Sequence, residues 1–145
     1  DGSHVTQPDT LMMEAAMRLA LDDADLCPSA IGYISAHGTA TDRGDVAEGQ
    51  ATARLFGNKT PISTLKSYTG HTLGACGALE AWVSIEMMRS GWFHGNANLE
   101  NADPACGDID LLYTAGRQID TSYIMSNNFA FGGLNTSIVF KRWVS

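Results

Sequence analysis

Apolar residues recur at helical spacing in three segments of the chain. The first segment covers residues 10–23, and Thr10 or Asp9 can cap the start of its helix. The spacing predicts a buried side built from Leu11, Met12, Ala15, Ala16 and Leu19. Asp25 follows, at a point where a helix-ending glycine is common. Asp tolerates the left-handed conformation that such an ending requires.

The second and third helices are predicted further along the chain. Asp45 and Glu48 stand at the spacing of a capping box, and Gly57-Asn58 supplies the stop of the second helix. The third helix covers about residues 73–89 and closes at Gly91. One of its sides is built from small residues, namely Gly74, Ala75, Gly77, Ala78 and Ala81. Because small side chains let another backbone approach closely, we predict that this helix is central and buried.

Short β-rich segments lie between and after these helices. Residues 31–36 lack polar alternation, which is typical of a strand covered on both faces. The other predicted strands are residues 61–65, 109–113, 123–126 and 136–142. Strands and helices that alternate, followed by strands, predict an α/β layered domain. No repeat divides the chain, so residues 1–145 are expected to form one domain. No strand precedes the first helix, which suggests a piece of something larger.

Composition narrows the range of functions. The chain has 145 residues, of which 44% are apolar and 17% charged, as in globular proteins. A net charge of −7 argues against binding to nucleic acid or to an anionic membrane, and no apolar run is long enough to span one. The three cysteines (Cys27, Cys76 and Cys106) are far apart and form no C-x-x-C. We therefore expect a reducing, cytoplasmic location and no disulfide framework or structural zinc.

Three loops next to predicted strands are rich in Gly, Thr, His or Asn: residues 37–41, 66–72 and 127–135. In open α/β sheets, ligands bind outside the carboxyl ends of the strands, so His37 and His71 are predicted to face one reacting atom. Imidazole can donate a hydrogen bond to a developing oxyanion or move a proton near neutral pH. His71 precedes the third helix, whose N-terminus favours a neutral imidazole. The alternative is that each histidine only caps a helix or satisfies a loop.

Three stretches of the sequence resemble successive motifs of one family. They read SAHGTATDRGD, LKSYTGHTLGACGALEA and SNNFAFGGLNTSIVF. In this order they resemble the C-terminal half of the β-ketoacyl-[acyl-carrier-protein] synthases, condensing enzymes of the thiolase superfamily, over residues 11–143. The resemblance implies a thiolase-like α-β-α layered fold, with a mixed sheet and a buried central helix. It also implies a decarboxylative Claisen condensation of malonyl-carrier with an enzyme-bound acyl group, in fatty acid or polyketide synthesis.

The resemblance assigns roles to individual residues. His37 and His71 would stabilise the enolate that forms when malonyl-carrier loses CO₂. Lys66 would be the family lysine and Glu80 its acidic neighbour; this pair either tunes the field around the histidines or is structural. The phosphopantetheine arm would bind the two threonines of the first motif, Thr39 and Thr41. The acyl-pocket gate is expected at Phe131, beside Gly132 and Gly133, whereas Phe129 is better explained by core packing.

The resemblance also implies partners. Substrates would be carried on the phosphopantetheine of an acyl carrier protein, with no other cofactor. The N-terminal half of the same enzyme and a second subunit, in a homodimer or heterodimer, would complete the assembly. We expect no metal, because His37, Asp42 and Asp45 lack a zinc-ligand spacing. His4 and His94 are expected to be solvated loop residues.

The family nucleophile is a cysteine in the N-terminal half, and no segment here resembles its setting. Cys76 stands where alanine is usual and is expected to be packed and inert. Cys27 follows a helix C-terminus, whose negative end should raise the pKa of the thiol. Cys106 lies in an acidic loop, which also disfavours the thiolate. An alternative is a non-catalytic partner subunit of the chain-length-factor type, although His37, Lys66 and His71 argue against it. A domain of a modular polyketide synthase is a third possibility.

Overall fold

The computed structural model describes residues 8–143, so His4 lies outside the described residues. The α-helices are α1 (Thr10–Asp23), α2 (Asp42–Phe56), α3 (Lys66–Thr69) and α4 (Cys76–Ser90). The strands are β1 (Ile34–Ser35), β2 (Pro61–Ser63), β3 (Trp92–Phe93), β4 (Asp110–Leu111), β5 (Arg117–Gln118), β6 (Tyr123–Ala130) and β7 (Leu134–Lys141). Short 3-10 turns occur at Pro28–Ala30, Leu73–Ala75 and Pro104–Cys106. No helix among the described residues is long and apolar enough to cross a membrane.

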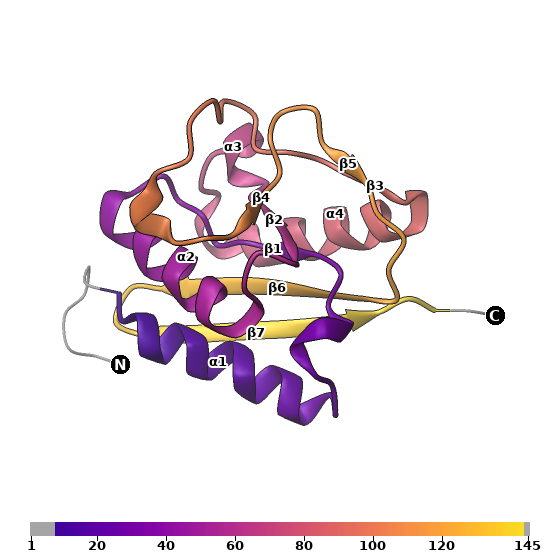
Figure 1. Ribbon diagram of the computed structural model, residues 1–145, viewed down its shortest axis with the longest axis horizontal. Coiled ribbons are helices and arrows are strands. Elements are labelled where there is room, and N and C mark those ends of the chain that lie inside the picture. The colour runs from indigo at the N-terminus through magenta and orange to yellow at the C-terminus, as the bar shows by residue number, and fades with distance from the viewer. Residues whose placement is uncertain (1–7, 144–145) are drawn as a thin grey trace.

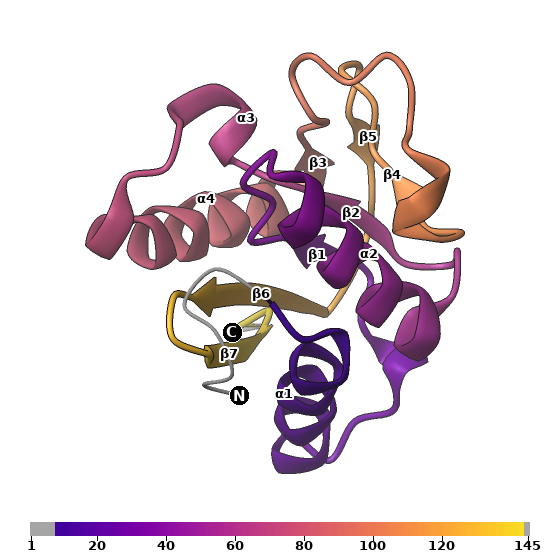
Figure 2. The same cartoon turned by 90° about the vertical axis from the view of Figure 1, so that its left-hand side faces the viewer.

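Five strands form a mixed sheet in the order β4-β2-β1-β6-β7. The first four are parallel, and β7 runs antiparallel to β6. Figures 1 and 2 show α4 on one side of this sheet and α1 and α2 on the other. The chain therefore has the expected α-β-α layered arrangement with a mixed sheet (Figure 2). The strands β3 and β5 form a separate antiparallel pair.

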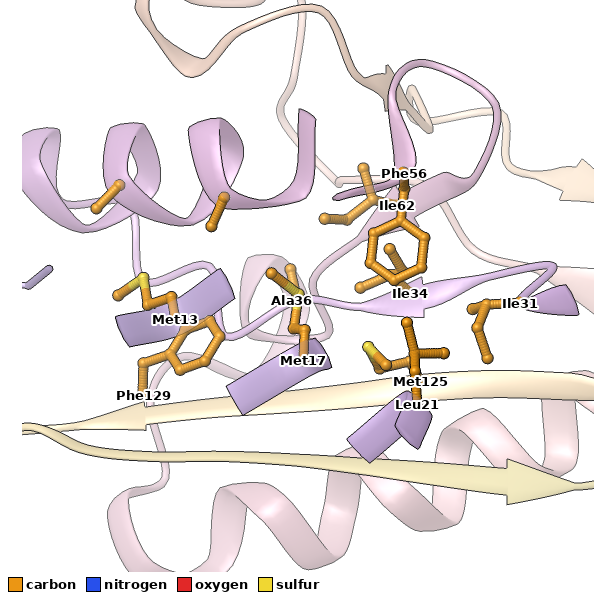
Figure 3. Close-up of a cluster of buried hydrophobic side chains, with 12 residues drawn as sticks. Met13, Met17, Leu21, Ile31, Ile34, Ala36, Phe56, Ile62, Met125 and Phe129 are labelled. Atoms are coloured by element: carbon orange, nitrogen blue, oxygen red, sulfur yellow. The ribbon is translucent and has the colours of Figure 1, made fainter. Parts of the chain in front are cut away.

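The core lies on both faces of the sheet because consecutive strand residues point to opposite sides. Ile34 and Met125 are fully buried on the side of α1 and α2, where they pack with the cluster in Figure 3. Their chain neighbours Tyr33 and Ile124 are buried in a second cluster with residues of α4 and β3. Fully burying a side chain of this size contributes about 1.5–3 kcal/mol, so the two clusters fix the strands that carry the site.

The buried side of α1 differs from the prediction. Met13, Met17 and Leu21 are buried, whereas Leu11, Met12 and Leu19 are exposed. The helix carries two apolar stripes at helical spacing, and contact with α2 and β7 selects one of them. Asp9 is the N-cap, as expected, and its side chain accepts from the N–H groups of Leu11 and Met12. Asp25 adopts the expected left-handed conformation, with φ 54°.

The other helix boundaries also shift. The N-cap of α2 is Thr41, so Asp45 and Glu48 lie inside the helix and do not form a capping box. The predicted loop at residues 66–72 contains the short helix α3, and α4 begins only at Cys76, after a 3-10 turn. On α4 the side predicted to be buried is not the buried one. Gly74, Ala75 and Ala78 are exposed and Gly77 and Ala81 are half-buried, because the helix turns its other side, with Cys76, Glu80 and Ser84, to the sheet. Glu80 is buried against the sheet, but Trp82 is 63% exposed.

The predicted loop at residues 127–135 is mostly strand. In the structure β6 continues to Ala130 and β7 begins at Leu134, so only residues 131–133 form the turn of a hairpin. Asn127 is polar and fully buried in β6, and hydrogen bonds make this possible. Its amide donates to Met17 Sδ at 3.3 Å, and its carbonyl oxygen accepts from Ser137 Oγ at 2.8 Å. Both ends of the buried amide are therefore satisfied.

Candidate functional site

A pocket of about 800 Å³ lies where the three polar segments meet. The segment after β1 contributes His37, Thr39 and Thr41 to its lining. The segment after β2 contributes His71, and the β6–β7 hairpin contributes Phe129 and Phe131. The carboxyl ends of parallel strands share one edge of a sheet, which is why segments far apart in sequence converge here. The predicted convergence of the first two loops is therefore confirmed, and the β6–β7 hairpin joins them.

His37 and His71 face each other across this pocket. Their ring centroids are 5.5 Å apart, and the rings stand at 87° to one another. His37 is half-buried and also packs edge-on against Phe129 at 6.2 Å. His71 is exposed, and its Nδ1 accepts a hydrogen bond from the Leu73 N–H at 3.1 Å. Because Nδ1 of His71 is an acceptor, the proton of the neutral ring is on Nε2.

Lys66 and Glu80 form a buried ion pair behind His37. The Lys66 ammonium donates to Glu80 Oε1, and both residues are buried. Lys66 Nζ also lies 3.5 Å from Nδ1 of His37. An ammonium only donates, so Nδ1 of His37 is the acceptor and its proton is on Nε2. Burial, then Lys66 and His71, lowers the pKa of His37 to about 4, so this imidazole is neutral at pH 7.

Glu48 supports the His37 loop and was missed as a site residue. Its Oε1 accepts from the N–H of His37 and its Oε2 from the N–H of Gly38, each at 2.8 Å. The carboxylate is 4% exposed. Burial raises its pKa to about 7, although the two N–H groups act in the opposite direction. The available signal was a carboxylate among the small residues Ala47, Gly49 and Ala51, which was interpreted as a cap.

Asn128 is a second residue that the sequence did not single out. Its Nδ2 donates to Glu80 Oε2 at 3.0 Å, and its Oδ1 accepts from Cys76 Sγ at 3.2 Å. Asn128 was predicted to lie in a loop, and a loop position does not indicate where a side chain points. In β6 the side chain points toward α4, and it links Cys76 to the Lys66–Glu80 pair.

The two threonines lie at the rim of the pocket. The Oγ1 atoms of Thr39 and Thr41 are 3.1 Å apart. Thr39 is half-buried, Thr41 is exposed, and Ala40 between them adopts a left-handed φ of 57°. Asp45 lines the same pocket and lies near the backbone N–H groups of residues 39–41. Burial raises the pKa of Asp45, although these N–H groups act in the opposite direction. Both hydroxyls are in a position to meet a ligand that enters the pocket.

The two phenylalanines of the hairpin differ sharply. Phe129 is 7% exposed and belongs to the core cluster of Figure 3, which confirms the packing interpretation. Phe131 is 74% exposed at the turn, where Gly132 follows with φ 80°. A positive φ suits glycine because it has no Cβ. Phe131 lines the pocket without being part of the core.

The cysteines agree with the predictions in two cases of three. Cys76 is buried, as expected. Burial and Asp103 raise the pKa of Cys106, which has the expected direction. For Cys27 the prediction is wrong, because a hydrogen bond with Ser29 lowers the pKa of this exposed thiol. The cause is local: α1 ends at Asp23, and Cys27 is the N-cap of the following 3-10 turn.

His94 also differs from the prediction, because it is half-buried and not solvated. Its Nδ1 donates to the Gly95 carbonyl at 2.9 Å, and its ring meets the edge of Tyr68 at 5.3 Å. Burial lowers its pKa. Within residues 8–143, no group of three His, Cys, Asp or Glu side chains is arranged to hold a metal ion.

Comparisons with known proteins agree on one family. Residues 1–100 match the family described as "Beta-ketoacyl synthase, C-terminal domain". The chain is 39% identical to 3-oxoacyl-[acyl-carrier-protein] synthase 2 of Coxiella burnetii over 147 residues. This alignment covers 98% of this chain and 35% of that protein. The chain thus spans about a third of the length of this relative.

Solved structures give the same result. A β-ketoacyl synthase from Burkholderia phymatum STM815 is 60% identical with a TM-score of 0.97, over 99% of this chain and 35% of the other. A ketosynthase in complex with its chain length factor, from Xenorhabdus doucetiae, gives 36% identity and a TM-score of 0.84, over 99% and 37%.

Proposed function

Because the chain belongs to the β-ketoacyl synthase family, we propose that it is the C-terminal half of a 3-oxoacyl-[acyl-carrier-protein] synthase. The intact enzyme would condense malonyl-carrier with an acyl group held on a cysteine of the N-terminal half. One observation carries the proposal. His37 and His71 face each other with ring centroids 5.5 Å apart, and each Nδ1 is engaged as an acceptor. Each ring therefore keeps an Nε2–H donor free for a ligand, and both rings line the same pocket.

This pair of donors suits decarboxylation. When the malonyl thioester loses CO₂, the electron pair of the broken C–C bond passes to C2 and, by resonance, to the thioester oxygen. Donors placed where that charge develops lower the barrier, and removing one such donor costs about 10²–10³ in rate. The C2 carbon then attacks the acyl carbonyl. The thiolate of the N-terminal cysteine leaves, and the product is a 3-ketoacyl-carrier thioester.

Lys66 and Glu80 prepare His37 for this role. The Lys66 ammonium, 3.5 Å from Nδ1, supports the low pKa of His37 and holds its tautomer. Glu80 neutralises the buried lysine, because a buried charge without a partner is strongly unfavourable. The site thus combines a neutral imidazole with a nearby positive charge.

The rim of the pocket fits a long, flexible substrate arm. Thr39 and Thr41 offer hydroxyls to the amide groups of phosphopantetheine, and Phe131 is placed to gate the acyl pocket. An acyl carrier protein would deliver the arm, with no further cofactor. Gly132 and Gly133 follow Phe131 directly and give this turn the backbone freedom that such a gate needs.

The N-terminal half is the proposed partner for an uncovered apolar surface. Trp82 and Ile85 on α4 are 63% and 38% exposed, and Leu134 and Ile138 on β7 are 68% and 55% exposed. These large apolar side chains on α4 and β7 are the surface that we propose the N-terminal half covers. The intact enzyme is proposed to be a cytoplasmic homodimer or heterodimer.

A second candidate is a non-catalytic subunit of the chain-length-factor type. It is favoured by the similarity to a ketosynthase that is complexed with its chain length factor. The complete arrangement of His37, His71 and Lys66 favours the catalytic subunit, because a subunit without chemistry has no need of two oriented donors.

The test uses the intact enzyme with His37→Ala and His71→Ala. Each variant should lose about 10²–10³ in malonyl decarboxylation, and acylation of the N-terminal cysteine should be largely retained. His94→Ala, which removes a half-buried imidazole outside the pocket, is the control for lost packing. Normal malonyl turnover in either pocket variant rejects the catalytic assignment. A wild-type protein that never decarboxylates malonyl-carrier supports the partner-subunit alternative.

A further inference from the structure

The amide of Asn128 lies between two residues of α4 and bonds to both. Its Nδ2 donates to Glu80 Oε2 at 3.0 Å, and its Oδ1 accepts from Cys76 Sγ at 3.2 Å. Glu80 and Cys76 are one helical turn apart, so they present adjacent groups to β6. This pattern fixes the orientation of the amide. The thiol holds the carbonyl end, and the NH₂ end faces the carboxylate.

Glu80 needs both of its partners because it is 1% exposed. Lys66 bonds to Oε1 and Asn128 to Oε2, so each carboxylate oxygen has a donor. A buried ion pair is favourable only when hydrogen bonds satisfy its remaining lone pairs. With Oε2 held by Asn128, the Oε1 atom is directed at Lys66, and the ammonium stays within reach of His37.

We propose that Asn128 is a positioning residue, which holds Glu80 so that Lys66 stays between Glu80 and Nδ1 of His37. The proposal rests on the proposed function and adds a residue to those named there. Asn128 lines the same pocket, but its side-chain hydrogen bonds go to Glu80 and Cys76 and not to either histidine. It acts through a chain of contacts that runs from Cys76 to Asn128, Glu80, Lys66 and His37.

Several titratable groups surround this chain of contacts, and each enters the pH dependence of the rate. Tyr33 precedes β1 and faces Glu80. Burial raises the pKa of Tyr33, and the negative charge of Glu80 raises it further. From α2, Glu48 interacts with Lys66, and the ring of His71 interacts with His37. In the wild type, the lysine charge helps to lower the pKa of His37. A carboxylate freed at Oε2 can turn and draw the ammonium away, so the pKa of His37 should rise.

The experiment replaces Asn128 in the intact enzyme and measures two quantities. Asn128→Leu keeps the size of the side chain and removes both hydrogen bonds. Asn128→Asp keeps the size and places a second carboxylate beside Glu80. Malonyl decarboxylation should fall about 10- to 100-fold in both, by analogy with the hydrogen-bond partners that orient metal ligands. The pKa of His37, followed by NMR of labelled histidine, should rise from about 4 toward its ordinary value of 6.5.

Two further variants control the comparison. Thr136→Val removes a hydroxyl that donates to the Asn128 backbone carbonyl and leaves the amide side chain intact. It should change neither the rate nor the pKa of His37. Cys76→Ala removes only the thiol that orients the amide, so its effect should have the same direction and be smaller. If one Asn128 variant does not fold, the other variant and Cys76→Ala carry the same two measurements.

The outcomes separate the inference from the proposed function. If folded Asn128 variants keep the wild-type rate, pH profile and His37 pKa, Asn128 is structural and the inference is wrong. His37→Ala is measured in parallel. If that variant still decarboxylates malonyl-carrier, the proposed function fails, while the NMR titration of His37 still decides the role of Asn128.

Discussion

Lys66 Nζ lies 3.5 Å from Nδ1 of His37, and the same ammonium donates to Glu80. One positive charge therefore acts on the imidazole in two ways. It opposes protonation of the ring, and it keeps the ring proton on Nε2, the nitrogen that can face a substrate. The low pKa of His37 follows first from burial and then from this charge.

Lys66→Met should raise the pKa of His37 above its wild-type value of about 4. The direction follows because a nearby cation disfavours the imidazolium. The single variant leaves the buried Glu80 carboxylate without its positive partner, which costs about 3–5 kcal/mol. The double variant Lys66→Met/Glu80→Gln avoids this cost and should still show the raised pKa. NMR titration of His37 is the measurement, with Lys59→Met at an exposed site as the control. An unchanged pKa in the double variant contradicts the electrostatic role of Lys66.

Glu48→Gln should lower the free energy of unfolding and change its dependence on pH. Gln offers one acceptor oxygen, so one of the N–H groups of His37 and Gly38 loses its partner. Leaving such a buried donor unpaired costs about 1–3 kcal/mol. The control is Glu100→Gln on the exposed surface.

The pH dependence has a definite sign. The pKa of Glu48 rises from 4.5 to about 7 on folding, so the native state binds more protons in this window and stability falls as pH rises. The pKa of His37 falls from 6.5 to about 4, so its contribution to stability rises with pH over that range. The two slopes oppose each other. Urea unfolding of Glu48→Gln should therefore show a steeper rise in stability from pH 4.5 to 6.5 than the wild type, and parallel slopes contradict the buried carboxylate.

The layered fold and the histidine pair could be predicted because their signals are local. Apolar segments bounded by turn residues mark the strands, and polar loops at strand ends mark the site. The predicted loop around Asn128 was wrong for a tertiary reason. Ser137 and Met17 satisfy the adjacent Asn127 inside the sheet, and neither contact can be read from a short segment.

Glu48 shows a second limit. Its spacing from Asp45 suggested a helix cap, but the helix begins earlier, with Thr41 as its N-cap. The function of a mid-helix carboxylate depends on which backbone N–H groups the fold brings to it. Here these are two groups at the end of β1, which lie ten or more residues away in sequence. Likewise, the choice between the two apolar stripes of α1 depended on contact with α2 and β7.

Phe131→Ala and Phe129→Ala should have different consequences in the intact enzyme. Phe131 is 74% exposed, so its loss should change which acyl chains load, or how fast, with little effect on stability. Phe129 is 7% exposed in the core, and its loss should cost about 3–5 kcal/mol. Acylation rates with short and long acyl-carriers, together with urea unfolding, make the comparison. If Phe131→Ala destabilises the enzyme as much as Phe129→Ala, the gate assignment is wrong.

The isolated 145-residue chain should have no condensing activity, because the reaction needs a thiolate that holds the acyl group beside the histidines. Cys76 lines the pocket, but it is 7% exposed and its thiol donates to Asn128. The raised pKa of Cys106 disfavours its thiolate. Cys27 has the lowered pKa, yet it precedes β1 while His37 follows it, so the two residues lie at opposite ends of that strand.

The measurement is acyl transfer from a labelled acyl-carrier to the purified chain, followed by mass spectrometry. Alkylation with iodoacetamide serves as the internal control, and it should modify Cys27 fastest because this thiol is exposed and has a lowered pKa. Neither Cys76 nor Cys106 should carry an acyl group, since the first is enclosed and the second is held as a thiol. Any acyl group on Cys27 should remain unextended when malonyl-carrier is added, because its thioester cannot reach an enolate formed at His37. A thioester on Cys76 that is extended to a 3-ketoacyl product would show that the chain contains its own nucleophile.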